Sequence, residues 1–332
     1  MRLPKPRGRL GVEVFDRLVE MPRQLPADEE VRAADPEDAA SVLWVLHELS
    51  YRGFEDVADD AASDPESDPE VARVRRVLER DLEARLRSRW DAERRSRAEM
   101  GVEPGAADDV VAALIELIET HEGPSMARFV QSRADAEQAR ELLRMRSIYH
   151  LKEADPTAWL VPRLPTRAKA ALAEIQYDEY GGGRPERLHH ALFASGLEGA
   201  GLRSEYGAYL DEAPLEVLEQ NNAVSLFGMR RRLRGAAAGH FAAFEATSSV
   251  PSRRLAQGLA RLGLGEAVVG YYREHVEADS VHDQLALRFV CAALVEEQPE
   301  LRDDVLFGAF TCLDLEARFA AAQFDRWGVE GA

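Results

Sequence analysis

Helical periodicity dominates this sequence and constrains its fold more than any other feature. Apolar residues recur at three- and four-residue steps along most of the chain, and the alternating pattern of a half-buried strand is hard to find. Ala, Leu, Arg and Glu, all strong helix formers, are abundant. We therefore predict an all-α fold. The predicted helices span residues 41–53, 71–99, 107–121, 125–154, 165–180, 185–196, 214–248, 252–263, 265–297 and 300–326.

Shifts in composition divide the 332 residues into two parts. Residues 59–70 are acidic and rich in Pro and Ser, as expected of a loop. Residues 71–99 carry many Glu/Arg pairs at helical spacing, which is typical of a solvent-exposed helix. We predict an N-terminal helical extension over residues 1–105, which contains the acidic loop, followed by the main helical domain over residues 106–332.

The charge balance excludes one large class of partners. The chain has 42 Lys and Arg against 60 Asp and Glu, a net charge of −18, which argues against binding to the phosphate backbone of nucleic acids. Its basic run, residues 230–234, is interpreted as the solvated face of a helix. Because no stretch approaches 18 uncharged apolar residues, no membrane span is predicted. A small molecule is the expected partner.

The termini and cysteines indicate the compartment. The N-terminus is basic but lacks a following apolar run of signal-peptide length. Cys291 and Cys312 lie in apolar helical segments, where free thiols are expected. Both features favour a reducing cytoplasm, and the sequence is compatible with a monomer or a homodimer.

The residues that carry chemistry begin with a stripe on one predicted helix. His275, Asp279 and His282 stand at positions i, i+4 and i+7, so they share one face. Two imidazoles and a carboxylate at this spacing are good ligands for a divalent transition metal. The alternative is a salt-bridged surface helix on which the two histidines have no metal.

A second pair with similar spacing favours the metal. Glu186 and His189 form a Glu-x-x-His pair, which recurs in di-iron carboxylate bundles, and Asp279 and His282 form its Asp version. Glu153 precedes the first pair by 33 residues and Glu245 precedes the second by 34. Glu245 also lies in an apolar segment, where an unpaired charge would be costly. The pattern predicts a two-metal site with approximate two-fold symmetry.

At these residues the chain resembles the haem-oxygenase-like di-iron oxidases and oxygenases, also called iron-containing redox enzymes. The segments that carry the resemblance are HLKEADPTAW, EIQYDEYGGGRPERLHHALF, HFAAFEATSS and YYREHVEADSVH, which fall within about residues 140–285. The resemblance implies a haem-oxygenase-like helical bundle that holds two Fe(II) ions in place of haem and uses dioxygen as co-substrate. The ligands it implies are Glu153, Glu186, His189, Glu245, His275, Asp279 and His282.

The resemblance also concerns Glu179. Some members that oxygenate nitrogen carry one more carboxylate seven residues before the Glu of the Glu-x-x-His pair, and Glu179 occupies that position. It is either a catalytic carboxylate that adjusts the coordination or a helix-end residue before Gly181–Gly183. Family activities include N-oxygenation, oxidative decarboxylation of fatty acids and carbon–carbon cleavage of amino acids. They imply oxidation of an amine, an amino acid or a fatty acid.

Two other classes of function remain open from the sequence. A ferritin-like iron-binding or ferroxidase protein shares the order of ligands, although His275 favours the haem-oxygenase-like arrangement. A non-enzymatic interaction protein could use the charged helix 71–99 to dock a partner. His47 and Glu48 are interpreted as a core or interface pair, and His240 as either a packing residue or a neighbour of the ligands. Trp159, Tyr177, Tyr271 and Tyr272 are interpreted as core residues, with tyrosines available to hydrogen-bond metal ligands.

Overall fold

The computed structural model describes residues 1–20, 24–58, 64–99 and 109–329; the side chains of residues 20 and 277–281 lie outside this description. The described residues fold into helices joined by turns, and they contain no strand. The all-α prediction is therefore confirmed. No helix among them is long and apolar enough to cross a membrane. Both cysteines are buried and free.

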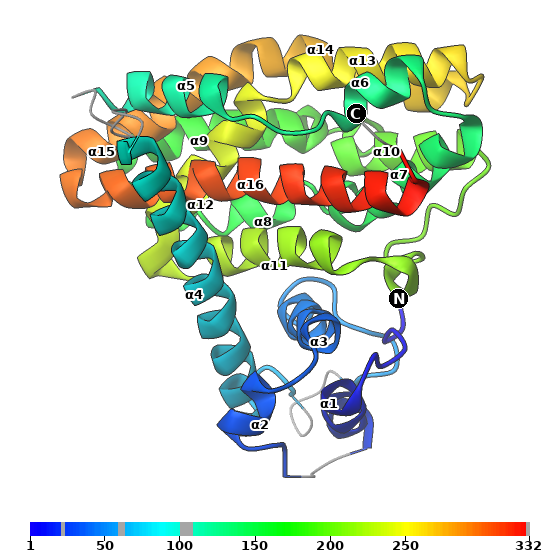
Figure 1. Ribbon diagram of the computed structural model, residues 1–332, viewed down its shortest axis with the longest axis vertical. Coiled ribbons are helices and arrows are strands. Elements are labelled where there is room, and N and C mark those ends of the chain that lie inside the picture. Colours follow the sequence, from blue (N-terminus) through cyan, green and yellow to red (C-terminus); the bar gives the residue numbers. More distant parts are fainter. Residues whose placement is uncertain (21–23, 59–63, 100–108, 330–332) are drawn as a thin grey trace.

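Most helices lie roughly parallel or antiparallel in a bundle, with α16 crossing its middle (Figure 1). Below the bundle lie α1 to α3, and the long helix α4 runs from them up one side of the bundle. The helices of this N-terminal layer are α1 (Arg9–Glu20), α2 (Asp28–Arg32), α3 (Pro36–Glu48) and α4 (Pro69–Glu99). The bundle contains α5 (Val110–Thr120), α6 (Met126–Ser132), α7 (Ala136–His150), α8 (Asp155–Ala158), α9 (Thr166–Glu179), α10 (His189–Gly199), α11 (Leu215–Met229), α12 (Arg234–Ala246), α13 (Ser249–Arg261), α14 (Glu266–Gln284), α15 (Ala293–Glu297) and α16 (Arg302–Trp327).

Several predicted helices are divided by local signals. The predicted helix 125–154 breaks into α6 and α7 because Asp135 caps the second helix, accepting hydrogen bonds from the backbone of Glu137 and Gln138. The predicted helix 214–248 breaks into α11 and α12 at a short 3₁₀ turn, Arg231–Leu233. The predicted helix 265–297 contains a π-helical segment, Leu285–Ala292, between α14 and α15.

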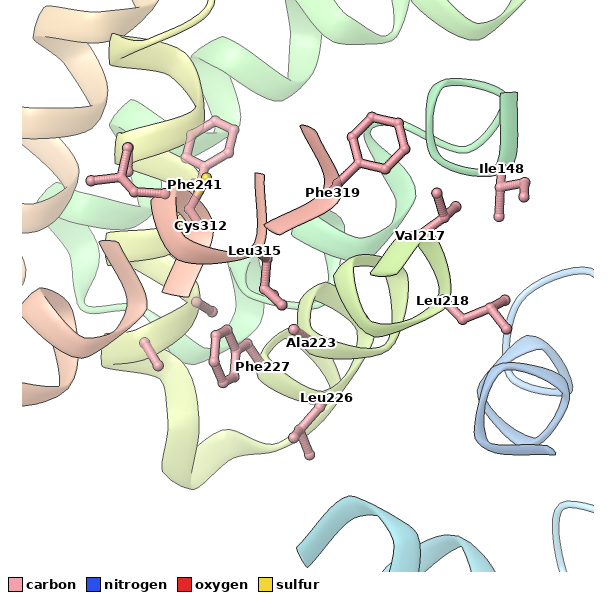
Figure 2. Packing of buried hydrophobic residues seen from close by; sticks show 14 of the residues in the cluster. Ile148, Val217, Leu218, Ala223, Leu226, Phe227, Phe241, Cys312, Leu315 and Phe319 are labelled. Carbon is pink, nitrogen blue, oxygen red and sulfur yellow. The ribbon is translucent and has the colours of Figure 1, made fainter. Parts of the chain in front are cut away.

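The core is continuous from the bundle into the N-terminal layer. In Figure 2, Phe227 and Ala223 of α11 lie on the side that faces Leu315 of α16, while Leu218 points towards the N-terminal layer. α12 and α16 approach closely because both carry glycine at the contact. A Cβ at Gly239 would overlap the carbonyl oxygen of Val305, and one at Gly308 would overlap that of Ala236.

The charged helix α4 is paired within its own chain. Arg85 contacts Glu219 of α11 at 3.1 Å, and Arg87 contacts Asp304 of α16 at 2.6 Å. Arg89 forms a bidentate pair with Asp314, at 2.6 and 2.5 Å. The charged residues of α4, which the sequence offered as a surface for docking a partner, therefore attach the N-terminal layer to the bundle.

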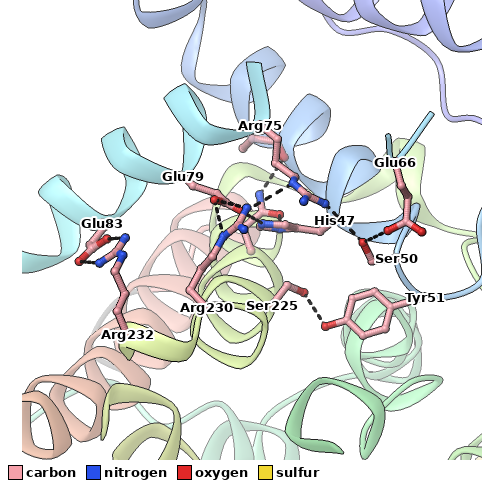
Figure 3. A network of polar contacts seen from close by, with 12 residues as sticks. His47, Ser50, Tyr51, Glu66, Arg75, Glu79, Glu83, Ser225, Arg230 and Arg232 are labelled. Atoms are coloured by element: carbon pink, nitrogen blue, oxygen red, sulfur yellow. Dashed lines mark hydrogen bonds and ion pairs between the residues drawn. The ribbon is translucent and has the colours of Figure 1, made fainter. Parts of the chain in front are cut away.

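The basic run 230–234 contributes to the same attachment through Arg230 and Arg232, although Arg231 and Arg232 are exposed as predicted and residues 231–233 form a 3₁₀ turn. Arg230 donates two hydrogen bonds to Glu79 of α4, at 2.8 and 2.7 Å, and Arg232 forms a bidentate pair with Glu83 (Figure 3). His47 lies beside Glu79, with its Nε2 3.2 Å from the carboxylate. As predicted, His47 is buried in the core, and Glu48 is too, paired with Lys152 at 3.2 Å.

Candidate metal centre

Six buried side chains meet inside the bundle, and most of them stand at helix ends. Glu179 is the last residue of α9, His189 is the first of α10, and Glu245 is the penultimate residue of α12. Glu153 lies in the turn after α7. His275 and His282 both come from α14. All six are at most 6% exposed, so none is a surface charge.

These side chains form two groups of possible metal ligands. Glu153, His189 and His275 make one group, and Glu179, Glu245 and His282 make the other. Within each group, one donor atom from every residue lies within 4.8 Å of the others. Each group thus offers imidazole and carboxylate donors, the ligand types that ferrous iron accepts.

Glu179 lies between the two groups. Its Oε2 is 2.9 Å from Nδ1 of His189 in the first group, and its Oε1 is 3.9 Å from Nδ1 of His282 in the second. The rings of His189 and His275 are 4.6 Å apart. One carboxylate therefore faces both groups.

The structure places Glu186 differently from the prediction. Its side chain is exposed and belongs to neither group. The reason is local: Gly181, Gly182 and Gly183 all have positive φ, and residues 185–187 form a 3₁₀ turn, so α10 begins only at His189. Glu186 and His189 are consequently not one turn apart on a helix, and Glu179 takes the position predicted for Glu186.

Asp279 cannot be placed, because its side chain lies outside the described residues. Its backbone belongs to α14, between His275 and His282. Its role as a ligand stays a prediction.

Hydrogen bonds orient the two histidines of α14. His275 Nδ1 lies 2.9 Å from the backbone carbonyl of Tyr271, to which it can only donate, so Nε2 is the acceptor nitrogen of the neutral ring. That Nε2 is 3.6 Å from Glu153. His282 Nε2 lies 3.2 Å from Asp178, and its Nδ1 is 3.6 Å from Glu245. Each ring thus has one nitrogen held by an acceptor and the other turned towards the cluster, as is usual for metal-binding histidines.

Glu153 is held by two residues that are not in either group. Tyr271 donates its hydroxyl hydrogen to Glu153 Oε2 at 2.9 Å, and His150 Nδ1 lies 2.9 Å from Oε1. The expectation that a tyrosine would hydrogen-bond a ligand is met by Tyr271, whereas Tyr177 is 62% exposed. Neither His150 nor Asp178 was predicted from the sequence. The i, i+3 spacing of His150 and Glu153 was a signal for the first, while Asp178 had none.

Neighbouring charges shift the pKa values of two side chains in the cluster, His282 and Glu153, towards their ionised forms. Burial lowers the pKa of the His282 imidazole, but the adjacent Glu245 and Asp178 outweigh burial and raise it to about 9. Burial raises the pKa of the Glu153 carboxyl, but His150 and His275 outweigh it and hold that pKa well below its usual range. Glu153 thus stays ionised beside imidazoles, and a divalent cation could balance its charge.

Two cavities border the cluster. A small one of about 10 Å³ is lined by Glu153, Glu179, Glu245 and His275. A larger one of about 290 Å³ shares Tyr149 and Phe244 with it. His240 lines the larger cavity and packs against Phe227, and burial lowers its pKa to about 4. His240 is therefore a neutral packing residue.

The six side chains lie within a region of the chain that matches a known protein family. The family model described as iron-containing redox enzyme, a haem-oxygenase-like family, matches residues 140–317, which include all six side chains. A comparison with curated proteins gives no match.

Several solved structures share the fold. One of them is the crystal structure of a CADD-like protein of unknown function from Nostoc punctiforme, 18% identical, with a TM-score of 0.52. The match covers 65% of this chain and 96% of that one. Since the family model covers more than half of the chain, the protein belongs to the haem-oxygenase-like family of iron-containing redox enzymes.

Proposed function

We propose that this protein is a non-haem di-iron oxidase or oxygenase, which binds two Fe(II) ions and uses dioxygen to oxidise a small organic substrate. One observation carries the proposal: two buried groups of imidazoles and carboxylates meet at a shared carboxylate, Glu179. In the proposed centre, Glu153, His189 and His275 hold one ion. Glu245 and His282 would hold the other, and Glu179, which faces both groups, would be available to either ion.

The residues present fit two metal ions better than haem. The cavity enclosed by the ligands measures about 10 Å³, which suits small ions and not a macrocycle. The donor set also fits, since imidazole and carboxylate together suit iron. Three buried carboxylates would be an unfavourable lining for the largely apolar face of a porphyrin.

Iron in this centre would supply the redox chemistry and the reaction with dioxygen. The chain itself sets the geometry. Tyr271 and His150 fix both oxygens of Glu153, and the Tyr271 carbonyl and Asp178 fix the rings of His275 and His282. The rigid helix ends then hold the ligands in place before any metal arrives.

The substrate is proposed to lie in the 290 Å³ cavity beside the cluster. Tyr149 and Phe244 line both cavities, so a molecule held there would lie next to the ligands. The burial of this region would keep bulk water from the reaction. The proposed substrates are an amine, an amino acid or a fatty acid, and the proposed reaction is N-oxygenation or oxidation at C–H or C–C bonds.

Anaerobic loading with Fe(II) tests the proposal. We expect two iron ions per chain after removal of unbound metal, magnetic coupling between them in Mössbauer spectra, and consumption of oxygen on exposure to air. Fewer than one iron per chain together with no oxygen uptake would refute the di-iron assignment.

A further inference from the structure

The 290 Å³ cavity contains an ion pair that the proposed iron chemistry does not use. Its lining is largely apolar, with Met126, Leu142, Met145 and Leu255 among its residues. Arg146 of α7 and Glu316 of α16 also line it. The Arg146 guanidinium donates from Nη1 to Oε2 of Glu316 at 2.9 Å and from Nη2 to Oε1, so the pair is bidentate.

Both side chains of this pair are partly accessible, and both can form further hydrogen bonds. The Glu316 side chain is 43% accessible and the Arg146 side chain 20%, although both line the cavity. Gln220 also donates to Glu316, at 3.0 Å. A carboxylate can accept about four hydrogen bonds and a guanidinium can donate about five, so each has capacity left for a ligand.

Two neighbours in the cavity wall keep one polar atom each without a hydrogen-bond partner among the described residues. Asn221 donates to the carbonyl of Val217 at 2.9 Å, which identifies Oδ1 as its unpartnered atom. The hydroxyl of Tyr272 is the other. Both residues are only 3% exposed, and an unsatisfied buried polar atom costs stability unless a ligand or water completes it.

The ion pair stands at a distance from the metal ligands. Arg146 and His150 are one turn apart on α7, roughly 6 Å along its axis, and Glu153 lies in the turn after that helix. His150 lines the cavity and also contacts Glu153. A head group held at Arg146 would therefore leave several atoms of apolar chain between itself and the cluster.

Resting on the proposed function, we infer that Arg146 and Glu316 recognise the zwitterionic head group of an amino-acid substrate, whose side chain extends towards the metal ligands. The substrate ammonium binds Glu316 and Asn221, and its carboxylate binds Arg146 and Tyr272. The charges of the pair sum to zero, so a zwitterion adds no net charge to a buried cavity. A simple alkylamine or a fatty acid would add one, which is costly in such surroundings.

Three probes with the same six-carbon skeleton test this inference: L-norleucine, n-hexylamine and hexanoate. Binding to the full-length, iron-free chain is measured by titration calorimetry. We expect norleucine to bind at least about tenfold more tightly than either singly charged probe, equivalent to about 1.4 kcal/mol. Equal or tighter binding of hexylamine or hexanoate would overturn the inference, as would the absence of binding by all three.

Variants separate recognition from folding. Glu316→Gln should lose norleucine and gain hexanoate binding, because Arg146 is then free to bind a carboxylate. Tyr272→Phe should weaken norleucine binding about tenfold without lowering Tm, since its hydroxyl has no partner to lose. Tyr206→Phe is the matched control: it removes a hydrogen bond to Glu48 far from the cavity wall, so Tm should fall and binding should not. Unchanged norleucine binding in both Glu316→Gln and Tyr272→Phe would refute the assigned contacts.

Because binding is measured without iron, its outcome is independent of the di-iron proposal. A chain that binds two irons but prefers hexanoate would retain the proposed function and lose this inference. A chain that prefers norleucine but binds no iron would retain this inference and lose the proposed function.

Discussion

Two clusters of buried carboxylates in this protein have different partners. Glu79 of α4, at the contact with the bundle, receives two hydrogen bonds from Arg230 and lies beside His47 (Figure 3). Glu153, Glu179 and Glu245 lie beside imidazoles instead. Both clusters are buried, and both face the cost of desolvating charge.

The difference in partner separates a structural cluster from a candidate metal centre. A guanidinium carries a permanent charge and fills both oxygens of its carboxylate, so the Glu79 pair is complete as it stands. An imidazole can give up its proton and offer a lone pair, so a metal can replace the proton as the source of positive charge. A buried acidic residue beside histidine is thus the better indication of a metal site.

The largest expected effect is the loss of the carboxylate that faces both groups. Glu179→Gln should lower iron content from two to at most one per chain and reduce oxygen uptake at least about tenfold, since an amide is a poor bridging ligand. Metal analysis and an oxygen electrode measure both. Glu186→Gln is the matched control, because that exposed side chain should leave both values unchanged. Loss of iron and of oxygen uptake in Glu186→Gln, with no loss in Glu179→Gln, would instead identify Glu186 as a ligand.

In the structural cluster, the removal of Arg230 should act on stability alone. Arg230→Met removes both hydrogen bonds of Glu79 to a guanidinium and leaves it beside His47 and Arg75, whose Nε is 3.9 Å from Oε1, and we expect a loss of about 2 kcal/mol in the free energy of unfolding. This is less than the roughly 3–5 kcal/mol of a fully buried pair, because the Arg230 side chain is 32% exposed.

Arg232→Met provides the comparison, because its pair with Glu83 is more exposed and should be worth less than about 1 kcal/mol. Urea denaturation measures both variants, and iron content should stay at two in each. A loss of iron in Arg230→Met would show that the two clusters are coupled.

A smaller effect is expected from the residue that orients Glu153. Tyr271→Phe removes a hydrogen bond at 2.9 Å, so iron affinity should fall about tenfold while stability changes by about 1 kcal/mol. Competition with an Fe(II) chelator measures the affinity. Tyr272→Phe changes the neighbouring residue, whose hydroxyl contacts no proposed metal ligand, so iron affinity should not change. Equal losses in both variants would indicate a general packing effect.

The smallest effect concerns alkaline pH. A protonated His282 stabilises the iron-free fold below its unfolded pKa of about 6.5, and this contribution is lost as the pH rises through its folded pKa of about 9. Calorimetry of the iron-free protein should show Tm falling by a few degrees over this range, and the iron-loaded protein should show less change.

The structural cluster behaves in the opposite sense. Burial raises the pKa of Glu79, but His47 and Arg230 outweigh it and lower it to about 2. Its contribution to stability is present above about pH 4.5 and is lost only as the pH falls towards 2.

A fall in Tm at alkaline pH that is equally large with and without iron would contradict the role assigned to His282.

The sequence by itself determined the all-α class and most residues of the candidate centre. Helical periodicity is repeated along the whole chain, so local errors do not alter the class. His275 and His282 share one helix face, a relation that depends only on helical geometry. The apolar surroundings of Glu245 also marked it as unusual from the sequence alone.

Only the tertiary structure decided between Glu179 and Glu186. That choice depends on three glycines with positive φ, which turn the chain after α9 and delay the start of α10 to His189. Tertiary structure likewise paired Arg230 with Glu79 across 151 residues, and Arg146 with Glu316 across 170. Sequence spacing predicts contacts within a helix, but contacts between helices depend on how turns direct them and how their side chains pack.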